Sequence, residues 1–380
     1  MRRMLVAGMA FLVSIAVLME AGTVPFRQVG HLLVVECRLN GHDSPFNFVV
    51  DTGGRTFVDP ETARGLSLKT KGFGVKIETL SMGDMKLEDV FGLMMFDFKP
   101  LDSLGVKISG MIGSDLLERF TVTFDYSAGK MELSRARNLD RSASGLCMKF
   151  TTHPVNNAPL IPLKIGDLPE MQVMIDTGQP MDLVIPLALW DRIRPPGKVI
   201  RARGVVAKWP MTRSRENRLT RLENVRVGSL ASVTLPVFWA ELPAVLSMPL
   251  LGRDFLSRYR VTLCYPAREV RFQSIGDRHP DAGVSTFGFY MYWDAESACA
   301  RLRGVWEQSP ADRAGLAPED IVRSIQGDPV NHEAFPGLMN RMEDRNLKKL
   351  RMVVERNGRR RTVDLKRRAL FSGKAEDGSG

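Results

Sequence analysis

Apolar and polar residues alternate over residues 26–50, on both sides of Asn40-Gly41. Alternation with a period of two is typical of half-buried strands, and Asn-Gly is a strong signal for a tight hairpin turn. Residues 75–81 and 85–95 form a second such pair around Met82-Gly83-Asp84. The pattern therefore predicts two β-hairpins near the start of the chain.

Two short apolar runs end abruptly in Asp-Thr-Gly. Residues 47–50 lead into Asp51, Thr52 and Gly53, and residues 172–175 lead into Asp176, Thr177 and Gly178. Each run is typical of a buried strand, and the glycine permits a tight turn directly after it. The turn carries a carboxylate out of a hydrophobic strand, where its burial is costly unless the charge is used or neutralised.

The sequence after each Asp-Thr-Gly also repeats. Residues 113–126 and 252–265 align without a gap at an offset of 139 (252 − 113), while the two Asp-Thr-Gly copies lie 125 apart (176 − 51). An internal repeat of this size indicates two similar units in one chain. The identical pairs are Gly113/Gly252, Asp115/Asp254, Leu117/Leu256, Arg119/Arg258, Val122/Val261, Thr123/Thr262 and Tyr126/Tyr265.

These paired motifs resemble the aspartic proteases, specifically the retropepsin-like branch, over roughly residues 26–275. Each lobe of that family also has a later apolar-apolar-Gly strand, which Met111-Ile112-Gly113 and Leu250-Leu251-Gly252 match here. The resemblance implies a mainly β fold with two retropepsin-like acid-protease β-barrel lobes. Retroviral members obtain two lobes by dimerising, so this chain, which carries both, is expected to be a monomeric pseudo-dimer.

In this family a hairpin of each lobe folds over the cleft as a flap. The resemblance makes Gly72-Phe73-Gly74 the expected flap edge of the first lobe. Residues 200–216 occupy the corresponding region of the second lobe, but they are basic and give no flap alignment. Residues 135–146, which are polar and basic, are the expected link between the lobes.

The resemblance implies an aspartic endopeptidase that acts on protein or peptide substrates without a metal or cofactor. Asp51 and Asp176 would share one proton, because two adjacent carboxylates cannot both ionise. The ionised carboxylate would activate a water against the peptide bond, and the protonated one would hydrogen-bond the oxyanion. Cross-lobe hydrogen bonds and backbone N–H groups would support this dyad through Thr52, Thr177, Gly53 and Gly178.

The chain departs from the family pattern directly after each Asp-Thr-Gly. The family usually has Ser, Thr or Ala there, whereas this chain has Gly54 and Gln179. A hydroxyl at this position can bond the outer carboxylate oxygen, so its loss is expected to alter the difference between the two pKa values. The alternative function is a catalytically weak peptide-binding scaffold of the cell envelope, against which both intact motifs argue.

A different unit is expected after about residue 278. Residues 304–327 contain a strand, a Ser-Pro-Ala helix start, an Ala-Gly-Leu helix end and a further strand and turn, an order that closely resembles a bacterial PDZ domain. Residues 333–349 fit the long helix beside the peptide groove, and residues 350–367 fit two closing strands around Asn357-Gly358. An α+β PDZ domain implies a peptide ligand that is extended or ends in a free carboxylate.

Residues Phe287, Gly288 and Phe289 allow two interpretations. They resemble the PDZ loop whose backbone N–H groups bind a C-terminal carboxylate, and they would then bind the peptide. They are equally typical of a plain apolar strand.

The N-terminus has the features of an export signal. Arg2 and Arg3 precede an uncharged run over residues 5–19, which is within the range of a signal-peptide core and short of the roughly 20 residues that span a bilayer. We expect a periplasmic, inner-membrane-anchored or secreted protein. Cleavage of the segment and its retention as an anchor both remain open, and a buried N-terminal helix is the alternative.

Charge and composition change this picture little. The 380 residues are 44% hydrophobic and 25% charged, as in globular chains of two or three domains. The net charge of +10 would suit a nucleic-acid binder. However, basic residues are spread along the chain, and the densest run, over residues 359–368, favours a solvated face or an anionic membrane surface. We therefore expect possible membrane association and no nucleic acid.

Cysteine and histidine suggest no metal site. The cysteines lie far apart, and we interpret them as core residues, with a disulfide possible in an oxidising compartment. The histidines are scattered and form no metal motif. These residues are Cys37, Cys147, Cys264 and Cys299, with His31, His42, His153, His279 and His332.

The expected organisation has five parts. A signal peptide or membrane anchor covers residues 1–24, the two protease lobes cover 25–140 and 141–278, a PDZ domain covers 279–371, and a disordered tail covers 372–380.

Overall fold

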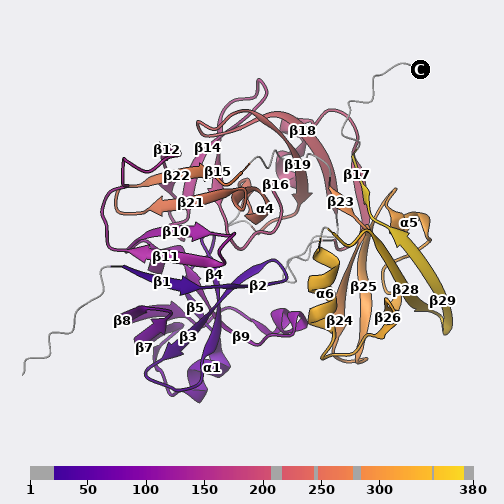
Figure 1. The fold of residues 1–380 in the computed structure, drawn as a ribbon, viewed down its shortest axis with the longest axis horizontal. Helices are drawn as coiled ribbons and strands as arrows, with labels where there is room; N and C mark the ends of the chain where they lie inside the picture. The colour runs from indigo at the N-terminus through magenta and orange to yellow at the C-terminus, as the bar shows by residue number, and fades with distance from the viewer. Residues whose placement is uncertain (1–20, 207–215, 244–246, 277–283, 345, 372–380) are drawn as a thin grey trace, which may run out of the picture.

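The computed structural model of the chain is mainly β (Figure 1). It describes residues 21–206, 216–243, 247–276, 284–344 and 346–371. We refer to residues 21–140 as the first lobe, 141–276 as the second lobe and 284–371 as the C-terminal unit. Residues 1–20 of the leader expected over residues 1–24, and the whole of the expected tail, lie outside the described residues.

An eight-stranded sheet builds most of the first lobe, in the order β2-β3-β4-β9-β5-β8-β7-β6. Because β3 also pairs with β7, the sheet curls back on itself around an apolar interior. Both predicted hairpins, β3–β4 and β7–β8, are confirmed. The elements are β2 (Arg27–Val29), β3 (Leu32–Leu39), β4 (Phe46–Asp51), β5 (Phe57–Val58), α1 (Pro60–Gly65), β6 (Lys69–Lys71), β7 (Gly74–Met82), β8 (Met85–Leu93), η1 (Lys99–Leu104) and β9 (Ile108–Gly113).

The second lobe repeats this plan within a longer sheet. Here β14 pairs with β18, as β3 pairs with β7 in the first lobe. The elements are β13 (Thr151–Thr152), β14 (Pro159–Ile165), β15 (Met171–Ile175), β16 (Leu183–Pro186), η2 (Leu187–Leu189), α3 (Trp190–Ile193), β17 (Ile200–Gly204), β18 (Asn217–Val227), β19 (Val233–Ala240) and β20 (Leu250–Leu251).

A six-stranded sheet joins the lobes, with β10 of the first paired antiparallel to β21 of the second. Thr123 and Thr262, which the repeat aligns, stand opposite each other with hydroxyl oxygens 3.0 Å apart. One apolar core runs through both lobes. The elements are β1 (Ala21–Pro25), α2 (Ser114–Leu117), β10 (Thr121–Asp125), β11 (Lys130–Ser134), β12 (Leu146–Lys149), α4 (Arg253–Leu256), β21 (Tyr259–Cys264) and β22 (Glu269–Ser274).

The C-terminal unit has a core of its own. The helix expected over residues 333–349 is shorter, because the backbone leaves the helical region at Asp344 and a strand begins at Lys349. The two strands expected after it are confirmed. The elements are β23 (Ser285–Thr286), β24 (Phe289–Asp294), β25 (Cys299–Trp306), α5 (Pro310–Arg313), β26 (Ile321–Ile325), β27 (Asp328–Pro329), α6 (Phe335–Glu343), β28 (Lys349–Arg356), β29 (Arg359–Lys366) and β30 (Arg368–Ala369).

The C-terminal unit is joined to both lobes. Strand β17 of the second lobe pairs with β25, so one sheet continues from the lobe into the unit. Trp306 of β25 is buried at this junction. Its ring packs edge to face against the ring of Phe238, with 5.9 Å between the ring centres. From the first lobe, η1 lies against α6 and β24, and the N–H of Gly30 donates to Asn340 Oδ1 at 3.0 Å.

Two expectations are corrected, and the disulfide that the sequence left open is absent. Ala21–Pro25 pairs with β11 and belongs to the first lobe, so the boundary after residue 24 is wrong. Cys147 is exposed rather than part of the core, because it lies on β12 at the end of the six-stranded sheet. All four cysteines are free thiols, so no disulfide forms. Among the described residues, no helix is long and apolar enough to cross a membrane.

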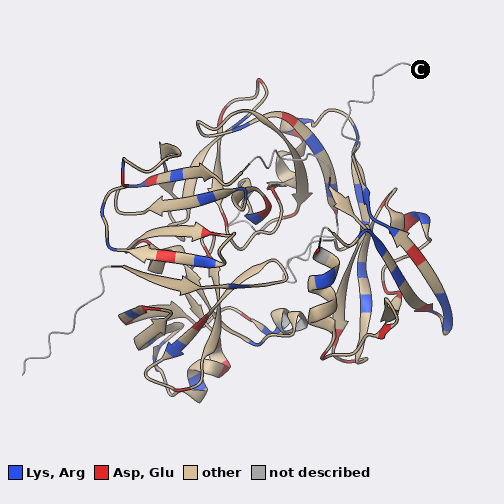
Figure 2. Ribbon diagram, viewed as in Figure 1, with Lys and Arg blue, Asp and Glu red and all other residues tan. Residues whose placement is uncertain are grey.

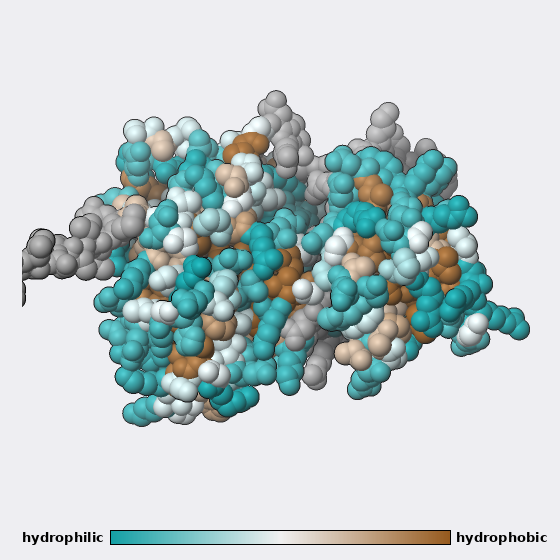
Figure 3. Space-filling view, turned by 60° about the horizontal axis from the view of Figure 1, so that its bottom comes forward, coloured by the Kyte–Doolittle hydropathy of each residue, from teal (hydrophilic) through white to brown (hydrophobic). Residues whose placement is uncertain are grey.

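The protein surface is mainly hydrophilic, as expected when most apolar residues are buried inside the lobes. Lysine and arginine are distributed over both lobes and the C-terminal unit (Figure 2). The face drawn in Figure 3 is largely hydrophilic, with apolar residues in small separate patches.

The junction at Trp306 predicts how the C-terminal unit unfolds. Trp306→Ala should destabilise the protein by about 3–5 kcal/mol, because it empties a buried site shared by the second lobe and the unit. In calorimetry, the C-terminal unit should then melt as a separate, earlier transition. The control is Trp293→Ala, which removes a half-buried ring inside the unit. A single transition in the Trp306 variant would contradict this view of the junction.

Candidate active site

Asp51 and Asp176, the two expected catalytic carboxyls, lie next to each other between the lobes. Asp51 ends β4, which runs parallel to β9, and Asp176 follows β15, which runs parallel to β20. Each carboxyl is therefore held beside the apolar-apolar-Gly strand of its own lobe. The two side chains are hydrogen-bonded to each other and are only 8% and 7% exposed.

Reciprocal threonine hydrogen bonds hold the two turns together. The N–H of Thr52 donates to Thr177 Oγ1 at 3.0 Å, and the N–H of Thr177 donates to Thr52 Oγ1 at 3.1 Å. Each hydroxyl in turn donates across the interface, Thr52 to the carbonyl of Ile175 at 2.7 Å and Thr177 to that of Val50 at 3.0 Å. Four buried hydrogen bonds thus fix one Asp-Thr-Gly turn relative to the other.

Glycine is needed at positions 53 and 178, because each position lies against the carboxyl of the opposite turn as well as against the carboxyl of its own turn. Each N–H donates to the aspartate of its own turn, at 2.8 Å and 2.9 Å. A Cβ at Gly53 would lie 2.5 Å from Asp176 Cγ, and one at Gly178 would lie 2.5 Å from Asp51 Oδ2. Any side chain at either position would therefore push the two carboxyls apart.

The two carboxyls differ in their electrostatic surroundings. Burial raises the pKa of Asp51, and burial together with the charge of Asp51 raises the pKa of Asp176 well above its usual value. The hydrogen bond between them lowers the pKa of Asp51 and raises the pKa of Asp176. Both carboxyls are therefore harder to ionise than an ordinary aspartic acid, and the pair retains one proton.

The unusual residues after the two motifs have local explanations. A Cβ at Gly54 would lie 2.8 Å from Met111 Sδ, so the methionine occupies the space that a side chain would need. The N–H of Gln179 donates to Asp176 Oδ1 at 3.0 Å. Asp176 therefore receives a second backbone hydrogen bond from its own turn.

Sequence reasoning missed two residues that hold the first turn. Buried Asn156, on the loop before β14, donates from Nδ2 to the carbonyl of Gly53 at 2.6 Å. Ser114 donates to the carbonyl of Thr52 at 2.7 Å and lies 2.9 Å from the hydroxyl of Tyr265. The repeat could have indicated Ser114 and Tyr265, which lie within its aligned segments. A single asparagine in a loop carries no such signal.

Arg253 stands where the repeat places the counterpart of Ser114, and it connects three parts of the chain. Its N–H donates to the carbonyl of Gln179 at 2.7 Å, in the turn after Asp176. Its guanidinium donates to the carbonyl of Gly30 in the first lobe at 3.2 Å. Since the N–H of Gly30 donates to Asn340 of α6, hydrogen bonds link the Asp176 turn to the C-terminal unit.

The loop at Phe287, Gly288 and Phe289 lies apart from the two carboxyls, in the core of the C-terminal unit. Both phenylalanines are buried, and the Arg367 guanidinium lies 4.5 Å from the centre of the Phe287 ring. Gly288 has a φ of +95°, and its N–H donates to Thr286 Oγ1 at 3.0 Å. The loop therefore has the positive φ that favours glycine, while one of its N–H groups is already satisfied.

The remaining expected features differ in how far the structure describes them. The expected flap edge, Gly72-Phe73-Gly74, covers the turn between β6 and β7 and the first residue of β7. Residues 207–215 of the corresponding second-lobe segment lie outside the described residues. Within the described part of the chain, no group of three or more His, Cys, Asp or Glu could hold a metal ion.

No protein-family model and no curated protein matches this chain.

The threonine network predicts the cost of removing one hydroxyl. Thr52→Val keeps the side-chain shape but leaves the N–H of Thr177 and the carbonyl of Ile175 without partners. We expect urea denaturation to show a loss of about 1–3 kcal/mol, the cost of buried unsatisfied groups. Thr123→Val is the matched control, because its hydrogen bond to Thr262 is only partly buried. Equal losses would contradict the special role of the turns.

The raised pKa of Asp176 predicts a pH dependence of stability. A raised folded pKa contributes stability that is present below the unfolded value, near 4, and lost as pH rises through the folded value. Asp176→Asn should therefore match the wild type at low pH and become increasingly more stable above about pH 4, by up to about 1.4 kcal/mol per pH unit. Urea midpoints across this pH range measure the difference.

The control for this experiment is Asp167→Asn, at an exposed position in the turn after β14. Its stability difference from the wild type should not grow with pH. A constant or falling advantage of Asp176→Asn would show that Asp176 ionises normally in the folded protein.

Proposed function

We propose that this chain is an aspartic endopeptidase in which Asp51 and Asp176 form the catalytic dyad of two retropepsin-like lobes arranged as a pseudo-dimer. The observation that carries the proposal is the hydrogen bond between two buried carboxyls on turns that are locked by reciprocal threonines. Such an arrangement is costly in a purely structural interface, because one carboxyl must be kept protonated or both must repel.

One retained proton gives the two carboxyls different roles in this proposal. Asp51, which we assign as the ionised member, accepts a proton from a water molecule as that water attacks the peptide carbonyl carbon. Asp176 holds its proton toward the carbonyl oxygen and stabilises the negative charge that develops there. The proton taken by Asp51 then passes to the leaving amine as the C–N bond breaks. Gly53 and Gly178 keep the carboxyls in place through their N–H groups.

We further propose that the C-terminal unit is a PDZ-like module that binds an extended substrate or partner peptide. The order of β24, β25, α5, β26 and α6 supports this, as does the positive φ of Gly288 before β24. Among the described strands, β24 pairs only with β25, and η1 of the first lobe lies against both β24 and α6, beside the edge at which a peptide strand would be added. Through β17 and Asn340, such binding would be mechanically connected to both lobes.

Export to the periplasm or inner membrane remains part of the proposal. It rests on Arg2, Arg3 and the apolar run over residues 5–19.

The decisive experiment is the digestion of unfolded casein by the wild type and by Asp51→Asn. We expect a loss of about 10²–10⁴-fold in rate, because the variant lacks the general base. Pepstatin, which mimics the tetrahedral intermediate, should inhibit the wild type. Asp167→Asn should cut normally, and the unfolding midpoint of Asp51→Asn should show that it remains folded.

Near-normal turnover by Asp51→Asn would exclude the dyad. A wild type that binds peptides without cleaving them would instead assign the lobes to the alternative function, a peptide-binding scaffold of the envelope.

A further inference from the structure

A pocket in the first lobe lies between α1 and the β6–β7 turn, and neither Asp51 nor Asp176 lines it. Figure 1 places α1 at the end of the first lobe that faces away from the second lobe. The pocket has a volume of about 240 Å³. That is smaller than the roughly 300–1,000 Å³ typical of sites for drug-sized ligands. Its size therefore suits a single bulky side chain.

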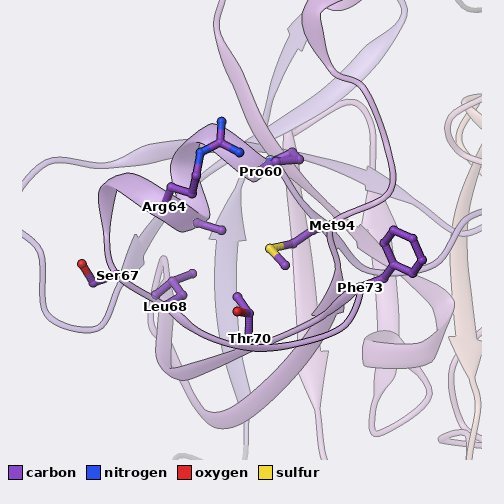
Figure 4. Close-up of a pocket in the computed structure, with 8 residues that line it drawn as sticks. Pro60, Arg64, Ser67, Leu68, Thr70, Phe73 and Met94 are labelled. Atoms are coloured by element: carbon purple, nitrogen blue, oxygen red, sulfur yellow. The ribbon is translucent and has the colours of Figure 1, made fainter.

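The walls of this pocket are mainly apolar. Leu68, Thr70 and Met94 gather between the helix and the hairpin, while Arg64 and Phe73 stand on opposite sides (Figure 4). The Phe73 ring is 67% exposed, although its carbonyl is fixed by the N–H of Met94 at 2.8 Å. A large exposed ring on a fixed backbone is well suited to cover an apolar side chain that enters the pocket.

Strand β6 borders the pocket and is the last strand of the first-lobe sheet. It pairs with β7 on one side, and no described strand pairs with its other side. Thr70 lines the pocket, so Lys69 and Lys71 point to the opposite face of the strand. A free strand edge beside a side-chain pocket is the arrangement used to bind extended peptides by strand addition.

The charges around this edge are positive and partly uncompensated. Lys69 forms an ion pair with Glu78. Within the described part of the chain, Arg64 and Lys71 are exposed and have no ion pair with a carboxylate. Two copies of this chain that met through β6 would bring lysines together, which is the usual way in which edge strands prevent self-pairing. An acidic strand would meet no such repulsion.

We propose that the pocket and the free edge of β6 form a binding site for an extended acidic peptide segment, with one bulky apolar side chain in the pocket. A residue opposite Thr70 directs its side chain to the pocket face, so its immediate neighbours in the peptide lie on the face of Lys69 and Lys71. The preferred core is therefore acidic–apolar–acidic. Arg64, at the side of the pocket, attracts a further carboxylate.

The role of this site rests on the proposed function only where the peptide is a segment of a substrate. A site that does not include the dyad would then hold the substrate protein while another part of its chain is cut. It would raise the local concentration of that chain at the dyad. Binding itself requires no catalysis and can be tested separately.

The test measures fluorescence anisotropy of a labelled peptide with the core Glu-Phe-Glu on the full-length Asp51→Asn protein, which should not cut it. Thr70→Trp fills the pocket and should raise the Kd about 10- to 100-fold. This is the loss of affinity expected when one large apolar side chain of the peptide can no longer be buried. Lys71→Glu and Arg64→Glu should each raise the Kd about three- to tenfold. Salt should weaken binding to the unaltered site.

Matched control variants distinguish effects at this site from the general effects of an added tryptophan or a reversed charge. Thr362→Trp adds the same ring to an exposed position of β29, and Lys86→Glu reverses an exposed charge on β8 of the same lobe. Neither should change the Kd. Peptides with the cores Lys-Phe-Lys and Glu-Ser-Glu should bind at least about tenfold more weakly, because each lacks one of the two recognition features.

Four results would overturn the proposal. They are no binding of the Glu-Phe-Glu peptide, equal weakening by the controls, displacement by pepstatin, or a dimer in sedimentation that Lys71→Glu disrupts. Displacement would assign the peptide to the cleft of the dyad, and the dimer would assign β6 to a second copy. Peptide binding at this site by a protein that does not digest casein would refute the proposed protease activity and leave the site intact.

Discussion

The fold is built around two carboxyl groups that are buried against each other. Burial disfavours the charge of each, and the charge of one disfavours the charge of the other, so a single proton must be retained between them. The arrangement persists because the backbone at each turn leaves room for the opposite carboxyl and because one turn is fixed relative to the other. Glycine at positions 53 and 178 and the four threonine hydrogen bonds provide this restraint.

The restraint depends on both lobes being held in one relative position. The six-stranded sheet does this directly, because β10 and β21 pair across the interface and a single apolar core continues through both lobes. Asn156 of the second lobe holds the turn of the first, and Arg253 of the second lobe reaches Gly30 of the first. A shift of one lobe would break hydrogen bonds at both turns and at the sheet.

The C-terminal unit packs directly against both lobes and is not connected to them by a linker alone. Its β25 extends the second-lobe sheet through β17, and its α6 contacts the first lobe at Gly30 and Gly105, where a Cβ would collide with Pro336. Deleting the unit would uncover Phe238 and the edge of β17. Point substitutions at its contacts are therefore cleaner probes of its role than truncation.

The sequence by itself determined the hairpins at Asn40-Gly41 and Gly83, the two closing strands of the C-terminal unit and the two acidic turns, because these depend on local periodicity, turn chemistry and an internal repeat. It also indicated that Asp51 and Asp176 belong together, since the repeat gave each the same surroundings. It could not reveal Asn156 or the β17–β25 pairing, because those contacts join residues far apart in the chain that carry no periodic or repeated signal. The sequence overestimated the length of α6 and the burial of Cys147, because neighbouring elements decide where a helix ends and which strand lies at a sheet edge. Tertiary structure alone decided which donors hold the two acidic turns in place, because these donors come from distant parts of the chain that only folding brings together.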